Sequence, residues 1–101
     1  MADKSALHAS ICAGLTDLYT RKNHDYGDSF AKSYREWGLA MPCIRLDDKL
    51  NRLKSLAKNP AKVQDESIRD TLLDLANYAI MTVIEMELEI EMELEKGENG
   101  K

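Results

Sequence analysis

Apolar residues recur every three or four positions along most of the chain, which is the spacing of amphipathic helices rather than of strands. Over residues 5–21 the apolar positions fall on one helical side: Leu7, Ile11, Leu15, Leu18 and Tyr19. Residues 23–29 are rich in turn formers and predict the end of this first helix. A short helix is expected over residues 30–37, with Asp28 or Ser29 as its N-cap and Gly38 as its stop.

Two longer helices are expected in the second half of the chain. Pro42 suits the first turn of a helix that extends to about Lys58, because the missing N–H is not needed there. The apolar stripe of this helix comprises Leu46, Leu50, Leu53 and Ala57. Residues 59–62 predict a break, and the last helix begins near Asp65. Its expected buried face comprises Ile68, Leu72, Leu75, Ala79 and Val83. The predicted fold is all-α: a helical bundle of three main helices plus one short helix.

Residues 84–95 alternate between acidic and apolar side chains, and the run Glu-Met-Glu-Leu occurs twice. Period two is typical of a strand, but Glu, Met and Leu are good helix formers, so we expect the last helix to continue through this segment. Alternation on a helix distributes apolar side chains around its whole circumference. Such a helix requires a partner, and the segment is then an oligomer contact; the alternative is a frayed acidic tail.

Length and composition fit one globular domain over residues 1–96, followed by a flexible tail at 97–101. The chain has 101 residues, of which 44% are hydrophobic, enough for a thin core that oligomerisation would supplement. The formal net charge of −4 argues against binding to duplex nucleic acid, which requires a basic face. No apolar run reaches the length of a membrane span or forms a signal core, so the expected localisation is cytoplasmic. Cys12 and Cys43 are expected as two reduced thiols in preference to a disulfide.

An acidic stripe runs along the last predicted helix. Its members are spaced by four, four and three residues and therefore line one helical side: Glu66, Asp70, Asp74 and Asn77. Crowded carboxylates repel each other unless a cation lies among them, and hard oxygen ligands on a rigid helix suit Mg²⁺ or Mn²⁺. The same spacing is compatible with a solvated face, or with carboxylates paired to basic residues of a neighbouring helix.

The preceding helix offers such basic residues. Arg45, Asp48, Lys49 and Arg52 share one of its faces. This row could pair with the acidic stripe for purely structural reasons. It could instead supply one further metal ligand, Asp48, and the cations for a polyphosphate, because Arg contacts phosphate in a bidentate manner and Lys acts as a point charge.

The predicted turn after the first helix carries a third group of side chains. Lys22, Asp25, Tyr26 and Phe30 crowd this short segment, which turn chemistry around Gly27 does not explain. A nucleobase could stack on Tyr26 or Phe30 with Lys22 near a phosphate. Packing into the core would also explain the two aromatic residues.

Three sequence blocks, in order, resemble one known family. The runs are K-N-x-D-Y-G-x-S-F at 22–30, R-x-x-D-K-x-x-R-L at 45–53 and E-S-x-x-D-T-x-x-D-L-x-x-Y at 66–78. They resemble the phage-type nucleotide-modification-associated domain family. That family is in turn similar to the MazG-like all-α pyrophosphohydrolases and dimeric dUTPases. Those enzymes bind Mg²⁺ with acidic residues on two helices and cleave a nucleoside triphosphate to a monophosphate and pyrophosphate.

The resemblance implies a MazG-like helical domain that binds a (deoxy)nucleotide or a modified form of one. It implies catalytic roles for Glu66, Asp70 and Asp74, and ligation of Mg²⁺ or Mn²⁺ by Asp48, Glu66, Asp70 and Asp74. The implied substrate-binding residues are Lys22, Asp25, Tyr26, Arg45, Lys49, Arg52 and Asn77. We expect a phage or prophage protein that acts in the cytoplasm of the host cell. We also expect it to form a homo-oligomer, either a dimer or a tetramer.

The sequence also departs from the pyrophosphohydrolase pattern. Thr71 occupies the position of the first acid in the pattern E-x-x-D that ends at Asp74. The preceding helix offers only Asp47 and Asp48 where E-x-x-E is usual. Because this chain has fewer carboxylates and more basic side chains than the pyrophosphohydrolase pattern, the sequence supports nucleotide binding more directly than hydrolysis. Three hypotheses are compatible with these features: a Mg²⁺-dependent pyrophosphohydrolase, a non-catalytic nucleotide-binding protein on the same scaffold, and a structural oligomer assembled through residues 84–95.

Overall fold

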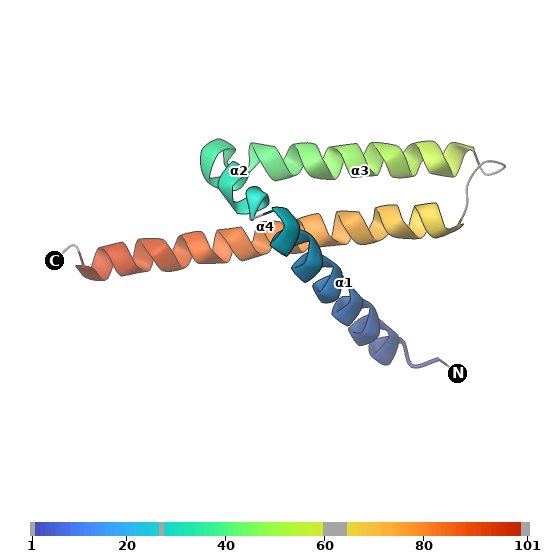
Figure 1. Cartoon of the computed structure of the whole chain (residues 1–101), viewed down its shortest axis with the longest axis horizontal. Coiled ribbons are helices and arrows are strands. Elements are labelled where there is room, and N and C mark those ends of the chain that lie inside the picture. Colours follow the sequence, from blue (N-terminus) through green and yellow to red (C-terminus); the bar gives the residue numbers. More distant parts are fainter. Residues whose placement is uncertain (1, 27, 60–64, 100–101) are drawn as a thin grey trace.

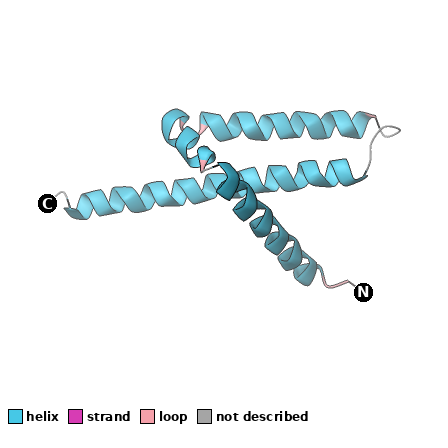
Figure 2. Cartoon of the chain, in the orientation of Figure 1, coloured by secondary structure: helices cyan, strands magenta, loops and turns pink. Residues whose placement is uncertain are grey.

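Four helices make up the computed structural model, which describes residues 2–26, 28–59 and 65–99, without the side chains of residues 25, 26, 65–67, 98 and 99. In chain order they are α1 (Lys4–Tyr26), α2 (Ser29–Trp37), α3 (Ala40–Lys58) and α4 (Asp65–Asn99). No strand occurs within the described ranges (Figure 2). The prediction of an all-α fold with three long helices and one short helix is therefore confirmed.

The antiparallel pair of α3 and α4 forms the body of the molecule (Figure 1). The short α2 leads into α3, and α1 crosses α4 near its middle. The first half of α1 and the last half of α4 therefore project away from the pair. The molecule measures 62 × 33 × 23 Å, and its radius of gyration is 17.0 Å. A compact chain of this length has a radius of gyration of about 13 Å, so this chain is markedly extended.

The first helix is longer than the sequence predicts. Its start is capped by Asp3, whose Oδ1 accepts a hydrogen bond from the N–H of Ala6 at 3.2 Å. The helix then continues to Tyr26, so the turn predicted at residues 23–26 is wrong. Asn, His and Asp each cost only about 0.5 kcal/mol relative to Ala inside a helix, and packing outweighs so weak a preference. The prediction for Gly27 lies outside the described residues.

The short helix begins and ends close to the predicted positions. Asp28 occupies the N-cap in a left-handed conformation, with φ of 60°, but its side chain makes no capping hydrogen bond. Gly38 ends the helix as predicted, and its N–H donates to the carbonyl of Tyr34 at 2.7 Å. Its φ of 67° and ψ of −155° lie in a region that is essentially confined to glycine.

Gly38→Ala is expected to lower the free energy of unfolding by about 1–3 kcal/mol, because these backbone angles are strained for any residue with a Cβ. No neighbouring atom of the described residues lies within 4 Å of a Cβ placed there, so the cost comes from the backbone alone. Gly14→Ala is the matched control, since Gly14 lies inside α1 with equally open space. That change should raise stability by about 0.5–1 kcal/mol. Urea unfolding measures both, and two effects of the same sign would contradict the assignment.

Both long helices of the second half are confirmed. Pro42 lies in the first turn of α3 and is fully buried. Asn59 follows the end of α3 as its C-cap, and the remainder of the predicted break, residues 60–62, lies outside the described residues. The alternating segment at 84–95 is helical, as predicted, and α4 extends beyond it to Asn99.

The core is small. The buried hydrophobic side chains of the described residues are Leu15, Ala31, Met41 and Pro42. On α4 the buried side chains are instead two threonines, Thr71 and Thr82. The Thr82 hydroxyl donates to the carbonyl of Tyr78 at 2.7 Å, which satisfies its polar group within the helix itself.

The predicted buried face of α4 is wrong in large part. Leu72 is 48% exposed, Val83 is 52% exposed, and Ala79 is also exposed. The reason is the direction from which α3 approaches: it covers the neighbouring helical side, where Thr71 lies. Within the described residues, the most regular apolar stripe of α4 is therefore exposed to solvent.

Both cysteines are free thiols, as predicted. Cys12 is half-buried and Cys43 is exposed. Among the described helices, none is long and apolar enough to cross a membrane.

Candidate functional site

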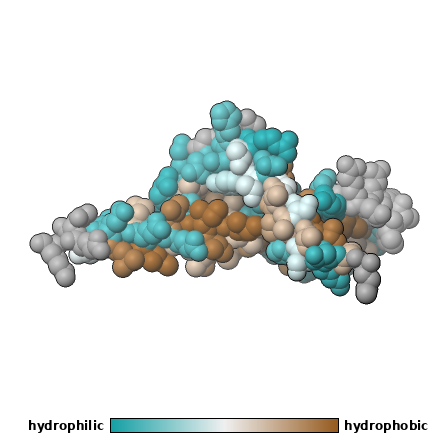
Figure 3. Space-filling model, turned by 90° about the horizontal axis from the view of Figure 1, so that it is seen from below, coloured by the Kyte–Doolittle hydropathy of each residue, from teal (hydrophilic) through white to brown (hydrophobic). Residues whose placement is uncertain are grey.

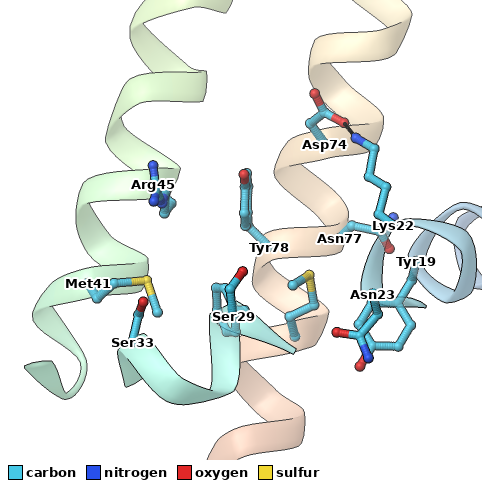
Figure 4. Close-up of a pocket in the computed structure, with 12 residues that line it drawn as sticks. Tyr19, Lys22, Asn23, Ser29, Ser33, Met41, Arg45, Asp74, Asn77 and Tyr78 are labelled. Atoms are coloured by element: carbon cyan, nitrogen blue, oxygen red, sulfur yellow. Dashed lines mark ion pairs between the residues drawn. The ribbon is translucent and has the colours of Figure 1, made fainter. Parts of the chain in front are cut away.

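A pocket lies where the four helices meet (Figure 4). Its volume is about 390 Å³, within the roughly 300–1,000 Å³ that is usual for small-molecule sites. All four helices contribute to its lining: Tyr19, Lys22 and Asn23 from α1, Ser29, Phe30 and Ser33 from α2, Met41 and Arg45 from α3, and Asp74, Asn77, Tyr78 and Met81 from α4.

One part of this lining is aromatic. The rings of Phe30 and Tyr78 are stacked, with centroids 6.1 Å apart and an interplanar angle of 28°. Tyr19 lies across the pocket on α1. Burial, followed by the carboxylates of Asp28 and Glu85, raises the pKa of the Tyr19 phenol above its usual 10.0. The phenol therefore stays protonated at neutral pH and keeps a hydroxyl that can donate a hydrogen bond.

Another part of the lining is cationic. Lys49 Nζ lies 3.1 Å from Asp74 Oδ2, and Lys22 Nζ lies 3.7 Å from Asp74 Oδ1 (Figure 4 draws the second contact). Arg45 points into the same space from α3, and it makes no ion pair with another described residue. Two ammonium groups thus contact one carboxylate, and the guanidinium of Arg45 lines the same pocket, in a chain whose net charge is −4. A local positive balance of this kind favours an anionic ligand.

Asn77 fixes the position of α1 against this site. Its Nδ2 donates to the backbone carbonyl of Leu15 at 3.2 Å, and Leu15 is itself buried. The contact joins α4 to α1 one turn before Tyr19 and two turns before Lys22. It therefore holds both side chains at the pocket.

A comparison with protein families identifies the family of this chain. Residues 22–86, more than half of the 101 residues, match the family described as Nucleotide modification associated domain 1. The chain belongs to this family. Every residue that lines the pocket lies in the matched region apart from Tyr19. No curated protein and no solved structure matches the chain.

The structure of this nucleotide modification associated domain brings together about half of the predicted site residues. Lys22, Arg45, Asp74 and Asn77 line the pocket, and Lys49 adjoins it through its ion pair with Asp74. Three other predicted residues, Asp48, Arg52 and Asp70, are exposed and do not line it. The side chains of Asp25, Tyr26 and Glu66 lie outside those that the structure describes.

The division along α3 has a simple cause. Arg45 and Lys49 are one helical turn apart, with Asp48 on the neighbouring stripe. Arg52 lies on nearly the same side of α3 as Arg45, but it is two turns further along the helix and does not line the pocket. The sequence placed all four on one face because consecutive stripes differ by only a fraction of a turn. Lys49 is distinguished by its contact with Asp74, and Arg45 by its place in the pocket lining.

Several residues that line the pocket were not predicted from the sequence. Tyr19, Met41 and Met81 carry only the signature of core residues, and their place at the pocket depends on the crossing of α1 over α4. Ser29 and Ser33 carry a usable signal, because they are four residues apart on α2 and share a side with Phe30.

The predicted Mg²⁺ site is not assembled by the side chains that the structure describes. Among them, no three His, Cys, Asp or Glu residues come together in a way that would hold a metal ion. Asp74 is engaged by two ammonium groups. Ligation of Mg²⁺ or Mn²⁺, for which Glu66 is one of the four predicted residues, stays a prediction.

Proposed function

We propose that this protein binds a nucleotide in the pocket between its four helices. The observation that carries the proposal is the division of one pocket into a stacked aromatic pair and a cluster of cations. A nucleotide has the same division, because its base is flat and weakly polar whereas its phosphates are strongly anionic. Membership of the nucleotide modification associated family supports the same ligand class.

The aromatic part suits the base. A nucleobase gains stacking energy against the Phe30 and Tyr78 rings, irrespective of its identity. The hydroxyls of Ser29 and Ser33 and the amide of Asn23 supply donors and acceptors for the edges of the base or for the sugar.

The cationic part suits the phosphates. The ammonium groups of Lys22 and Lys49 both lie within 4 Å of Asp74, so two cations are already close together at the proposed phosphate site. The guanidinium of Arg45 provides a planar donor for bidentate phosphate contact. Asp74 itself repels a phosphate, so its charge limits the affinity in the absence of a metal ion.

Calorimetry in buffer with EDTA tests this proposal. The eight common ribo- and deoxyribonucleoside triphosphates serve as probes, with a nucleoside and inorganic pyrophosphate as partial ligands. A triphosphate should bind more tightly than either partial ligand. Asp74→Asn should tighten triphosphate binding about fivefold, because a unit charge at about 4 Å contributes roughly 1 kcal/mol in water. Absence of triphosphate binding, or weaker binding by Asp74→Asn in EDTA, would overturn the proposal.

Hydrolysis to a monophosphate and pyrophosphate is a second candidate. It is favoured by the position of Asp74, which lines the pocket beside the proposed phosphate site, with Asp70 one helical turn earlier. The assay is release of pyrophosphate from each triphosphate with Mg²⁺ or Mn²⁺. Release by the wild type that is lost in Asp74→Ala would establish the reaction. Tight binding without release would leave a nucleotide-binding protein that does not hydrolyse its ligand.

A further inference from the structure

An uncovered apolar stripe runs along α4. Two series of residues spaced by seven form it, and we call it the α4 seam: Leu72, Ala79 and Met86, interleaved with Ala76, Val83 and Ile90. Five of the six side chains are exposed, and Ile90 reaches 59%. Seen from below, apolar side chains lie along the projecting half of α4 (Figure 3). A repeat of seven with apolar residues at these spacings is the pattern by which two helices pair along their length.

The exposed area of the chain is too large for a compact monomer. Its accessible surface is 8143 Å², whereas a compact monomer of 11.4 kDa exposes roughly 5,800 Å². The difference is about 2,300 Å² per chain, and a standard stable interface buries about 800 Å² on each partner. A second copy of the chain can therefore form a standard interface from this surplus alone.

The ends of the α4 seam carry opposite charges. One step of seven before Ala76 is Arg69, and one step of seven after Met86 is Glu93; both are exposed. If two seams pair antiparallel, Arg69 of one copy lies opposite Glu93 of the other, and this happens at both ends. If they pair parallel, Arg69 meets Arg69 and Glu93 meets Glu93. The charges therefore select the antiparallel arrangement.

The distribution of acidic residues along α4 gives the same answer. Residues 85–95 contain six glutamates, whereas residues 75–84 contain no charged side chain. An antiparallel pair with its axis near position 81 places each acidic segment beside residues 67–77 of its partner, which contain one arginine and two aspartates. A parallel pair would place the two acidic segments side by side, where their like charges repel.

We propose that a second copy of this chain packs on the α4 seam with its own α4 antiparallel, forming a two-fold symmetric dimer. Residues 72 and 90, 76 and 86, and 79 and 83 then meet across the axis, which passes near position 81. The pocket stays open in this dimer, because Asp74 and Asn77 leave α4 on the opposite side from the seam. Dimerisation and nucleotide binding are thus separable by mutation.

Cysteine cross-linking tests the arrangement. Leu72→Cys and Ile90→Cys are made separately in a chain with Cys12→Ser and Cys43→Ser, and each is oxidised alone and as a mixture. The mixture should form a covalent heterodimer, identified by mass. Neither chain should cross-link alone, because positions 72 and 72, like 90 and 90, lie about 27 Å apart along the axis at 1.5 Å per residue. Cross-linking of each chain alone, or none in the mixture, would overturn the proposal.

Charge exchange provides an independent test, made in the chain that keeps Cys12 and Cys43. Analytical ultracentrifugation should show a dimer for the wild type. Arg69→Glu and Glu93→Arg should each weaken the dimer about tenfold, since two exposed pairs are lost per dimer, and the double exchange should restore it. Ile44→Glu on the exposed side of α3 is the matched control and should leave the dimer intact. A monomeric wild type, or single variants that dimerise as well as the wild type, would overturn the proposal.

Discussion

Arg45→Ala is expected to weaken binding of a nucleoside triphosphate by roughly 10- to 100-fold, because a hydrogen bond to a charged group contributes about 1.5–3 kcal/mol. Arg45 lines the pocket from α3 and makes no ion pair with another described residue, so its guanidinium is available to a phosphate. The same change should weaken binding of pyrophosphate, which has no base. Calorimetry with both ligands measures the loss.

Arg52→Ala is the matched control for this prediction. Arg52 lies two turns further along α3, is exposed, and does not line the pocket. It carries the same charge, so its removal reports the effect of net charge alone, which salt screens. We expect a change of about twofold or less. Equal losses for Arg45→Ala and Arg52→Ala would place the phosphates elsewhere.

Tyr78→Ala is expected to weaken triphosphate binding by roughly 5- to 150-fold, because stacking of a base on an aromatic ring contributes about 1–3 kcal/mol. Tyr78 is half-buried and stacks on Phe30, and both rings line the pocket. In contrast to Arg45→Ala, the change should leave binding of pyrophosphate almost unaltered. This opposite ligand preference separates the base site from the phosphate site.

Tyr78→Phe controls for the loss of the ring. It keeps the stacking surface and removes only the hydroxyl, so triphosphate affinity should stay within about threefold of the wild type. Thermal melting of each variant establishes that the helices remain folded. A loss of pyrophosphate binding in a folded Tyr78→Ala protein would show that the ring does not serve the base alone.

The helices of this chain could be predicted from sequence because each depends on local features. Pro42 and Gly38 mark helix boundaries through backbone geometry that the sequence states directly. The predicted end of α1 was wrong. Several weak local preferences at residues 23–26 compete with packing, and sequence patterns contain no information on packing. The outward face of α4 was also wrong, since periodicity locates an apolar stripe without indicating which element covers it.

The candidate site was predictable where a residue pairs with a chemically opposite neighbour. The acidic stripe and the basic row required α3 and α4 to be adjacent, and the contact of Asp74 with Lys49 has that form. The contact of Asp74 with Lys22 of α1 was not predicted. The sequence could not separate Arg45 from Arg52, because the two lie on nearly the same side of α3 and only the position of the pocket along the helix distinguishes them. Nor could it place Tyr19 at the pocket, since that depends on the angle at which α1 crosses α4.

The proposed ligand of the pocket between the four helices is a nucleotide. Methyl NMR of the methionines tests this proposal directly, because Met41 and Met81 line the pocket while Met86 and Met92 lie exposed on the projecting half of α4. On titration with a nucleoside triphosphate in EDTA, we predict that the Met41 and Met81 methyl resonances shift, through the ring current of the base, and that those of Met86 and Met92 do not. Shifts confined to Met86 and Met92, or no shift at saturating nucleotide, would contradict the account.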